Sequence, residues 1–291
     1  MSTTIPHQVD DRAKAVCPGL RTDAVLHHSA KTVLLAGALD DVPVVAKVLV
    51  TTDPFWRARF AAEIATYRAF AVTPPPVPAP RLLAADPDAG VLVTTRLPGD
   101  PVATVRYPTH LDDTGAAPLL QAARDLGHWS APEGMFPTVW DYPHRFHRYR
   151  TVYGLLDTAD EAALTALVGI AAPNRPAHGD LLPANVLHQA GGVTAVLDWE
   201  FTGLFLPGMD AALLWILLGH LPAARRDAEH LAGNDLPHQA GFWVNTATVC
   251  VRELRTHRDL PDGPLRASRL AYLQATWDIV QARVHDLARR L

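Results

Sequence analysis

Short apolar runs separated by brief polar breaks occupy the first part of the chain, and this pattern predicts β-strands. The three runs expected to form strands span Ala24–His28, Thr32–Leu39 and Val42–Val50. Because the breaks between them are short, we predict an antiparallel meander. From Pro54 to Phe70 the pattern changes, since Phe60, Ile64 and Tyr67 recur at helical spacing with charged residues on the other faces. This segment is predicted to be an amphipathic helix with Asp53 as its N-cap.

The strand pattern continues for two more runs and then gives way to helix. Arg81–Ala85 and Gly90–Thr95 are predicted as strands, and Leu97–Asp100 breaks the pattern. Beyond the break, helical periodicity is found in Leu119–Trp129, Ala159–Ile170, Met209–Leu218, Gln239–His257 and Pro264–Leu291. The β-rich front and the helical back predict an α+β protein of two lobes, which we place at residues 1–96 and 97–291.

One segment of the helical part does not follow the helical pattern. Residues 173–200 predict a loop followed by two short strands, Val186–His188 and Val193–Leu197, with a turn at Gly191 and Gly192 between them. Polar residues cluster in the loop and just after the second strand. Such positions, held by a rigid scaffold, are where catalytic side chains concentrate.

Composition and charge narrow the class of protein. Of 291 residues, 48% are hydrophobic and 19% charged, which is typical of a globular protein. The net charge of -4 gives no electrostatic reason to expect nucleic acid or an anionic membrane as a partner. The most apolar stretch, Ala211–Leu218, is too short to span a bilayer.

The N-terminus and the cysteines bear on the compartment. Met1–Asp11 is polar and lacks the pattern of a signal peptide, and the two cysteines, Cys17 and Cys250, lie far apart in unrelated contexts. This excludes a disulfide framework and a cysteine zinc site, and it predicts a reducing, cytoplasmic location.

The candidate chemistry lies between His178 and Glu200. Four residues separate Asp180 from Asn185, and Asp198 follows the second predicted strand directly. Phosphoryl transfer requires that the acceptor oxygen be aligned and that phosphate charge be neutralised by metal ions and cations. Mg²⁺ prefers hard oxygen ligands, which a carboxylate and an amide can supply, while a second carboxylate orients a hydroxyl and accepts its proton.

The same spacing occurs in protein kinases, where a His-Arg-Asp motif with an asparagine five residues after the aspartate precedes Asp-Phe-Gly. Here Gly179 stands in place of the arginine, and Trp199 and Glu200 stand in place of Phe-Gly. In this form the motif resembles the aminoglycoside phosphotransferase and choline kinase family of small-molecule kinases. The resemblance implies a two-lobed, protein-kinase-like fold with a small antiparallel β N-lobe and a larger, mainly helical C-lobe. It also implies Asp180 as the catalytic base and Asn185 and Asp198 as Mg²⁺ ligands.

The front half of the chain extends this resemblance. Lys47 lies on the third predicted strand, where the family has its phosphate-binding lysine, and Glu63 lies where the family's partner glutamate is expected. The resemblance implies that the remaining nucleotide contacts come from Ser29, in a glycine-free phosphate loop, and from backbone groups of Thr94, Thr95 and Arg96. After Asp198, Asp210 matches a family aspartate whose expected role is to satisfy the backbone of the catalytic loop.

The function that the resemblance implies is transfer of a phosphoryl group from ATP or GTP to a hydroxyl of a small molecule, with an aminoglycoside or another antibiotic as the leading acceptor. No activation segment follows Asp198, so we expect no protein substrate. Alternatives are a metabolic kinase of a nucleoside, sugar or amino alcohol, and a catalytically silent nucleotide-binding relative.

For several charged residues the sequence leaves two roles open. Four acids, Asp157, Asp160, Glu161 and Glu200, either bind amines of an acceptor or belong to the protein surface. The arginine-rich stretches Arg252–Arg258 and Arg283–Arg290 are each either a solvated helix face or a contact for a phosphate-bearing substrate. Trp199 is interpreted as a packing residue.

Overall fold

The computed structural model describes residues 5–291. The first four residues of the polar N-terminal segment, on which the expectation of no signal peptide partly rests, lie outside the described residues. By compactness the chain divides into two units: unit 1 holds Met1–Asp100 and Leu187–Thr202, and unit 2 holds Pro101–Val186 and Gly203–Leu291.

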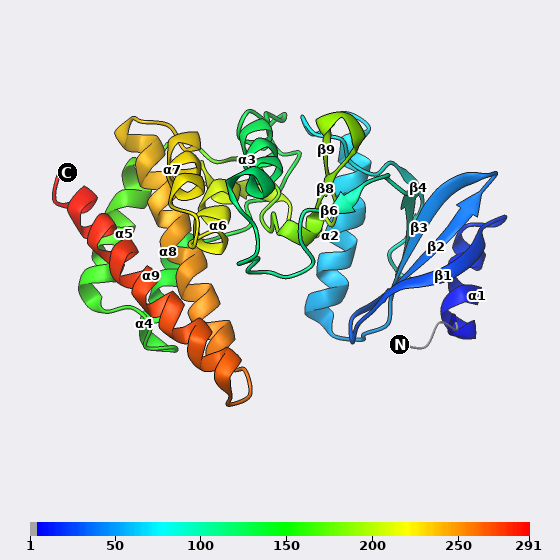
Figure 1. Cartoon of the computed structure of the whole chain (residues 1–291), viewed down its shortest axis with the longest axis horizontal. Coiled ribbons are helices and arrows are strands. Elements are labelled where there is room, and N and C mark those ends of the chain that lie inside the picture. Colours follow the sequence, from blue (N-terminus) through cyan, green and yellow to red (C-terminus); the bar gives the residue numbers. More distant parts are fainter. Residues whose placement is uncertain (1–4) are drawn as a thin grey trace. The chain divides into compact units, whose positions relative to one another are not determined.

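Unit 1 is built on a five-stranded sheet of order β1-β2-β3-β5-β4 (Figure 1). Its strands are β1 (Arg21–His28), β2 (Thr32–Leu39), β3 (Val42–Leu49), β4 (Leu82–Asp86) and β5 (Val91–Thr95). All neighbouring strands are antiparallel, which confirms the predicted meander of the first three. Short strands β6 (Asp100–Pro101), β8 (Val186–His188) and β9 (Thr194–Val196) pair in a separate three-stranded sheet of order β6-β8-β9.

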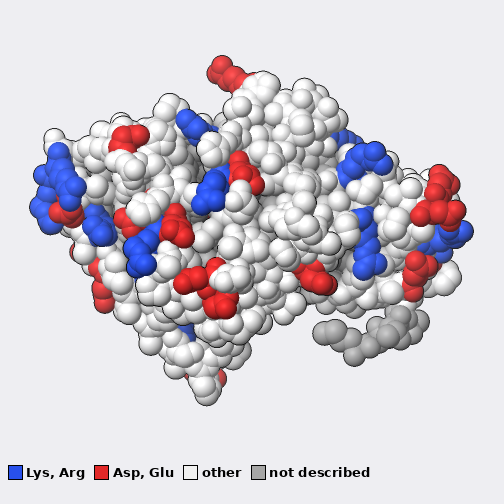
Figure 2. Space-filling model, turned by 45° about the horizontal axis from the view of Figure 1, so that its top comes forward, with Lys and Arg blue, Asp and Glu red and all other residues white. Residues whose placement is uncertain are grey.

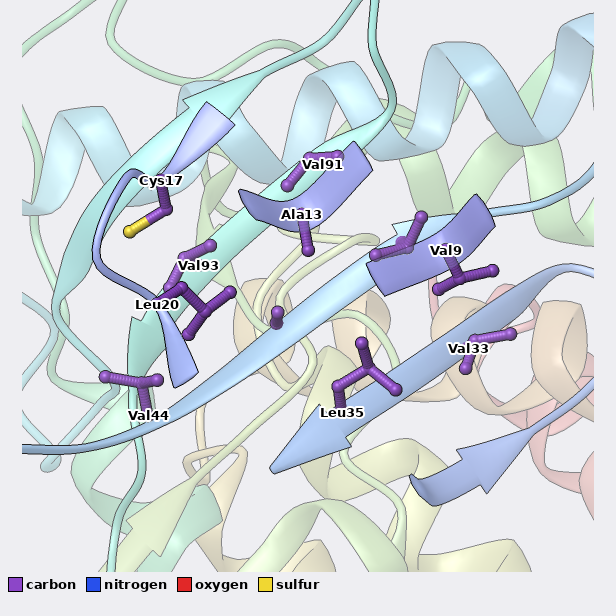
Figure 3. Close-up of a cluster of buried hydrophobic side chains, with 11 residues drawn as sticks. Val9, Ala13, Cys17, Leu20, Val33, Leu35, Val44, Val91 and Val93 are labelled. Carbon is purple, nitrogen blue, oxygen red and sulfur yellow. The ribbon is translucent and has the colours of Figure 1, made fainter. Parts of the chain in front are cut away.

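Helix α1 (His7–Val16) covers one face of the five-stranded sheet. Figure 3 shows its Val9 and Ala13 pointing toward the side chains of Val33, Leu35 and Val91, all of which are buried in one cluster. The sequence pattern did not predict this helix. Only Val9 and Ala13 of its ten residues are buried, so its apolar stripe is too narrow to stand out in a polar segment.

The alternation of side chains along β3 directs Lys47 to the face of the sheet opposite helix α1. Ala46 and Val48 belong to the cluster under α1, and successive side chains of a strand alternate between faces. Lys47 therefore points away from α1, toward helix α2 (Pro54–Phe70), whose bounds are those predicted. Asp53 accepts a hydrogen bond from the backbone N–H of Phe55, as expected of the N-cap.

Unit 2 is mainly helical (Figure 1). Its helices are α3 (Asp113–Gly127), α4 (Tyr142–Thr151), α5 (Thr158–Ile170), α6 (Met209–Leu217), α7 (Pro222–Leu231), α8 (Leu236–Arg258) and α9 (Pro264–Ala288). The apolar helix α6, in which every residue is buried, packs against α8, and α8 packs along α9. Among the described residues, no helix has the length and apolar character needed to cross a membrane.

A short antiparallel pair carries the loop of residues 178–185, which we call the catalytic loop after the role expected of Asp180. Strand β7 (Arg175–Ala177) pairs with β10 (Gly203–Phe205), and the loop follows β7 directly. A single 3₁₀ turn, η1 (Pro183–Asn185), ends the loop. A second 3₁₀ turn, η2 (Ala190–Gly192), lies in unit 1 between β8 and β9, where the sequence predicted a turn.

Candidate active site

Lys47 and Glu63 form the ion pair that the sequence predicted. Nζ of Lys47 on β3 lies 2.7 Å from Oε2 of Glu63 on α2. The Glu63 side chain is only 2% exposed and that of Lys47 13%, so the pair is shielded from water. Buried charges are retained only when they are paired, and each of these two depends on the other.

Two further carboxylates converge on the same ammonium group. Nζ of Lys47 lies 2.7 Å from Oδ1 of Asp198 and 3.4 Å from Oε2 of Glu200, while Nζ of Lys31 lies 3.8 Å from Oε1 of Glu200. Glu200, which the sequence left as either a surface acid or a functional carboxylate, thus belongs to the lysine cluster. We call Lys31, Lys47, Glu63, Asp198 and Glu200 the lysine-carboxylate cluster.

The backbone at Asp198 is strained and fixed by its neighbour. Asp198 has a φ of 61°, a left-handed conformation that is uncommon for residues other than glycine. The next residue, Trp199, is completely buried, and its ring meets that of Phe70 edge-on at 4.8 Å. Its interpretation as a packing residue is therefore confirmed, and this packing holds the segment that presents Asp198.

The charges of the cluster shift the pKa of both buried partners. Burial raises the pKa of Glu63 to about 7, with Asp198 and Glu200 adding to the rise against the attraction of Lys47. For Lys47, burial alone would lower the pKa, but Asp198, Glu63 and Glu200 outweigh it and hold the pKa well above its usual value. Lys47 therefore remains a cation.

The donor atoms of this cluster suit a magnesium ion. Oxygens of Glu63, Asp198 and Glu200 lie within 4.8 Å of one another, and carboxylate oxygens are the ligands that Mg²⁺ prefers. Three carboxylates face two lysines, so the cluster carries one more negative than positive charge when all three carboxylates are ionised. The side chain of Asp198 is 40% exposed, which leaves it accessible to an incoming ion.

In unit 2 the catalytic loop is tied to the start of helix α6. The two carboxylate oxygens of Asp210 accept hydrogen bonds of 2.9 Å each from the backbone N–H groups of His178 and Gly179. Gly179 has a φ of 81°, which a residue with a side chain rarely adopts. Burial raises the pKa of Asp210, and His178 and these two hydrogen bonds oppose the rise. The expected structural role of Asp210 is confirmed.

The same loop positions Asp180 and Asn185. The backbone N–H of Asp180 donates to Nδ1 of His178 at 3.3 Å, and Nδ2 of Asn185 donates to the backbone oxygen of Asp180 at 3.2 Å. This arrangement leaves the amide oxygen of Asn185 as its atom for a cation. The structure thus brings Asp180 and Asn185 together in unit 2, and Lys47, Glu63 and Asp198 together in unit 1.

The remaining predicted nucleotide contacts are engaged in local structure. Oγ of Ser29 accepts hydrogen bonds from the backbone N–H groups of Lys31 and Thr32 at 3.2 and 3.0 Å, and so closes the turn between β1 and β2. On β5, Thr94 is buried and Oγ1 of Thr95 accepts from the N–H of Arg81. The backbone N–H of Arg96 donates a hydrogen bond to the backbone oxygen of Pro43. Their contact with a nucleotide stays a prediction.

The surroundings of Asp180 contain residues that sequence reasoning did not connect with it. Guanidinium groups of Arg106 and Arg252 lie 3.7 and 3.6 Å from Oδ1 of Asp180, and both arginines contact Glu253. The only signal in the sequence was the arginine-rich stretch that begins at Arg252. Nothing local to Arg106 or Glu253 marks them, because they meet across 147 positions of the chain.

Comparison with known proteins identifies the class to which this fold and these residues belong. A family model described as the APH phosphotransferase enzyme family matches residues 43–243. The chain belongs to this family, as the motif around Asp180 predicted. A search of curated protein sequences found no match.

Solved structures of related fold cover nearly the whole chain. The GDP and kanamycin complex of APH(2″)-IIia has a TM-score of 0.61 and 14% identity, covering 96% of this chain and 98% of that one. A choline/ethanolamine kinase family protein from Mesorhizobium loti has a TM-score of 0.61 and 18% identity, covering 95% and 98%. Macrolide 2′-phosphotransferase MphH from Brachybacterium faecium has a TM-score of 0.58 and 17% identity, covering 92% and 98%. These similarities confirm the predicted protein-kinase-like α+β fold.

Proposed function

We propose that this protein transfers the γ-phosphoryl group of ATP or GTP to a hydroxyl of a small molecule, with Asp180 as the base. The observation that carries the proposal is the lysine-carboxylate cluster. Lys47, Glu63 and Asp198 come from distant parts of the chain, yet both carboxylates lie 2.7 Å from one ammonium group. Membership in a phosphotransferase family supports the same reaction class.

The proposed step moves one phosphoryl group and one proton. The acceptor hydroxyl gives its proton to the carboxylate of Asp180, and its oxygen forms a bond to the γ-phosphorus. The bond from that phosphorus to the β–γ bridging oxygen breaks, and the electron pair leaves with the nucleoside diphosphate. Lys47, which Glu63 orients, contributes a fixed positive charge for the phosphates of the donor.

Magnesium fits the proposed reaction through its known preference for oxygen ligands. We propose Asn185 and Asp198 as its ligands, with Glu200 as a further carboxylate beside Asp198. When bound, the ion neutralises charge on the phosphate oxygens. The residues of the chain do the remaining work, since Lys47 binds the donor and Asp180 orients the acceptor.

The acceptor in this proposal is a small molecule. The solved structures of related fold carry kanamycin, macrolide and choline or ethanolamine in their names. Antibiotics of the aminoglycoside and macrolide types therefore belong in the first panel of acceptors, together with sugars, nucleosides and amino alcohols. A role in resistance or self-protection would follow from an antibiotic acceptor.

The test is a mass-spectrometric screen of the purified protein with Mg²⁺ and either ATP or GTP. We expect a product heavier by one phosphoryl group. We expect Asp180→Asn to lower its rate by about a hundredfold or more while nucleotide affinity is kept, because only the proton acceptor is removed. The matched control is Asp113→Asn, at an exposed aspartate of α3, which should leave the rate unchanged.

Two outcomes would contradict the proposal at different points. Full turnover by Asp180→Asn would remove Asp180 from the role of base. Tight nucleotide binding without any product or nucleotide hydrolysis, across the whole panel and with both nucleotides, would favour a catalytically silent relative.

A further inference from the structure

Two guanidinium groups lie beside the proposed base. Nη2 of Arg106 and Nη2 of Arg252 are 3.7 and 3.6 Å from the same carboxylate oxygen, Oδ1 of Asp180. These distances are those of ion pairs and are longer than hydrogen bonds. Within residues 5–291, no hydrogen bond is made to either carboxylate oxygen of Asp180, and the shortest contact of each arginine is to Oδ1. Oδ2 is therefore the oxygen that can face an acceptor hydroxyl.

Glu253, rather than Asp180, holds the two arginines in place. Arg106 donates two parallel hydrogen bonds to Glu253, of 3.0 Å from Nε and 2.8 Å from Nη2, and Arg252 donates one of 3.3 Å. The hydroxyl of Tyr107 donates a fourth at 2.8 Å. Burial would raise the pKa of Glu253, but Arg252 and Arg106 lower it to about 2. The hydrogen bonds to Glu253 thus fix both arginines, and each guanidinium has further N–H groups that can point toward Asp180.

Positive charge is in excess around this group. The guanidinium of Arg269 lies 3.9 Å from the ring centre of Tyr107. Burial lowers the pKa of Arg145, and the positive charge of Arg252 adds to this effect. In the part of the chain that the structure describes, neither Arg145 nor Arg269 has an acidic side chain within ion-pair distance. Arg106 and Arg252 thus balance the two carboxylates of Asp180 and Glu253, and Arg145 and Arg269 add positive charge to their surroundings.

This positive excess is not a property of the chain as a whole. On the face shown in Figure 2, basic and acidic side chains alternate, and neither sign forms a large continuous area. The net charge of -4 likewise gives no general attraction for anions. Selectivity for a charged acceptor would have to come from the residues beside Asp180.

The acids considered for binding amines are engaged in unit 2 or in the lysine-carboxylate cluster. Asp157 caps helix α5, and Asp160 accepts hydrogen bonds of 2.9 Å from both Gln281 and His285. Glu161 is paired with Arg150 and with His147. Glu200 contacts Lys47 and Lys31. None of these carboxylates is held ready for an ammonium group of a substrate.

From these contacts we propose that the acceptor carries an anionic oxygen group, a carboxylate or a phosphate ester, close to the hydroxyl that is phosphorylated. Arg106 and Arg252 bind this group and thereby place the hydroxyl at Oδ2 of Asp180. The inference rests on the proposed function and narrows its acceptor. A polycationic aminoglycoside is disfavoured at this position, because like charges at such distances repel and arginines cannot lose their protons.

The first arm of the test measures binding without turnover, so that it stays informative even if no phosphoryl transfer occurs. The side-chain N–H resonances of ¹⁵N-labelled arginine are followed in the full chain at constant ionic strength. The probes are glycerate, glycerol 3-phosphate, glycerol and ethanolamine. We expect the Arg252 resonance, assigned by its absence in Arg252→Gln, to shift with one or both anionic probes and not with glycerol or ethanolamine.

The two anionic probes separate the two sources of negative charge. A larger shift with glycerate assigns the site to carboxylates, and a larger shift with glycerol 3-phosphate assigns it to phosphate esters. Absence of a shift with both, or an equal shift with ethanolamine, would overturn the proposal. Failure of the proposed function is recognised separately, as absence of transfer and of nucleotide hydrolysis in the mass-spectrometric screen.

The second arm uses the acceptor found in that screen together with its neutral amide or ester. We expect kcat/KM for the anionic form to exceed that of the neutral form by about tenfold or more, since charged hydrogen bonds discriminate to this extent. Arg252→Gln should reduce the ratio to about twofold, mainly through KM. Arg255→Gln is the matched control. Arg255 lies one turn further along α8 against the ring of Tyr153, and its substitution should leave the ratio unchanged.

The outcome of this arm also shows whether the arginines bind the acceptor or the phosphoryl group that is transferred. If Arg252→Gln lowered kcat by the same factor for anionic and neutral acceptors alike, the arginines would act on the phosphoryl group, and the inference would be wrong. It would also be wrong if the best acceptor were a polycation.

Discussion

At the scale of single residues, the most consequential buried charge in unit 2 is that of Glu253. Its side chain is only 4% exposed, yet it is ionised because Arg106, Arg252 and Tyr107 donate to it. Removing one partner of such a network leaves the others buried without compensation, which costs more than the network contributes when complete. Glu253 is therefore a residue at which stability and the geometry beside Asp180 are linked.

We predict that Glu253→Gln is destabilising near neutral pH and becomes less so in acid. The pKa of Glu253 in the folded protein, about 2, lies below its ordinary value of 4.5. The ionised carboxylate thus contributes about 3 kcal/mol to the free energy of unfolding above pH 4.5, and this contribution is lost as the pH falls toward 2. Urea unfolding at pH 7, 4.5 and 3 should show the gap between wild type and variant narrowing over the last interval.

The control for this prediction is Glu133→Gln, at an exposed glutamate, which should unfold like the wild type at each pH. A gap for Glu253→Gln that stayed constant down to pH 3 would mean that the carboxylate is not the group whose ionisation stabilises the fold. The arginine pair would then be held by packing alone.

At the scale of elements, the link between helix α6 and the catalytic loop sets the position of Asp180, the proposed base. Asp210 in the first turn of α6 satisfies two backbone N–H groups that precede Asp180 directly. Both of its carboxylate oxygens are used. An asparagine at this position would keep one acceptor and would turn an amide N–H₂ group toward a second donor.

We predict that Asp210→Asn lowers the free energy of unfolding by about 2 kcal/mol, the typical cost of an unsatisfied buried donor. It should also lower kcat with little change in the dissociation constant for the nucleotide, because the catalytic loop shifts while the lysine-carboxylate cluster does not contain Asp210. Thermal unfolding and steady-state kinetics provide the two measurements. Asp227→Asn, at an exposed residue of α7, is the control and should change neither. A stable variant with unchanged kcat would show that the loop keeps its shape without Asp210.

Elements with strong periodicity could be predicted from the sequence, and those with weak periodicity could not. The bounds of β2 and α2 are those expected, because apolar residues mark each of them along its whole length. Helices α4 and α7 were missed. In α7 only two alanines are buried, so that segment has no apolar stripe. In α4 the buried Tyr142, Phe146 and Tyr149 do lie at helical spacing, but the segment is only ten residues long and its other positions are mostly histidine and arginine, which hides the pattern.

The residues of the candidate site likewise divide into those that the sequence could predict and those that it could not. Asp180 and Asn185 could be named because their spacing is local and required by the chemistry. The arginines beside Asp180 could not, because their contacts depend on how α8 packs in unit 2. Resemblance to a family supplied Lys47 and Glu63, and the ion pair between them agrees with it.

At the scale of the whole molecule, the proposed machinery is divided between two units whose residues interleave along the chain. Residues 187–202 belong to unit 1, although they follow the catalytic loop of unit 2 in sequence. The expected lobe boundary after Arg96 remains a proposal, and the compact division falls after Asp100. Asp198 reaches Lys47 across 151 positions, so the first hundred residues alone lack part of the lysine-carboxylate cluster.

This division predicts that substitutions in the two units separate binding from turnover. Asp198→Ala should abolish the Mg²⁺-dependent part of nucleotide affinity, because it removes the exposed carboxylate of the cluster while Lys47 keeps Glu63 and Glu200. Calorimetric titration with MgATP or MgGTP should show a loss of affinity of about tenfold or more, and titration in EDTA should show little change.

Asp88→Ala, at an exposed turn residue of unit 1, is the control. Unchanged affinity for the magnesium complexes would remove Asp198 from the metal site. With Asp180→Asn binding normally and turning over slowly, the opposite behaviour of Asp198→Ala would assign donor binding to unit 1 and acceptor activation to unit 2.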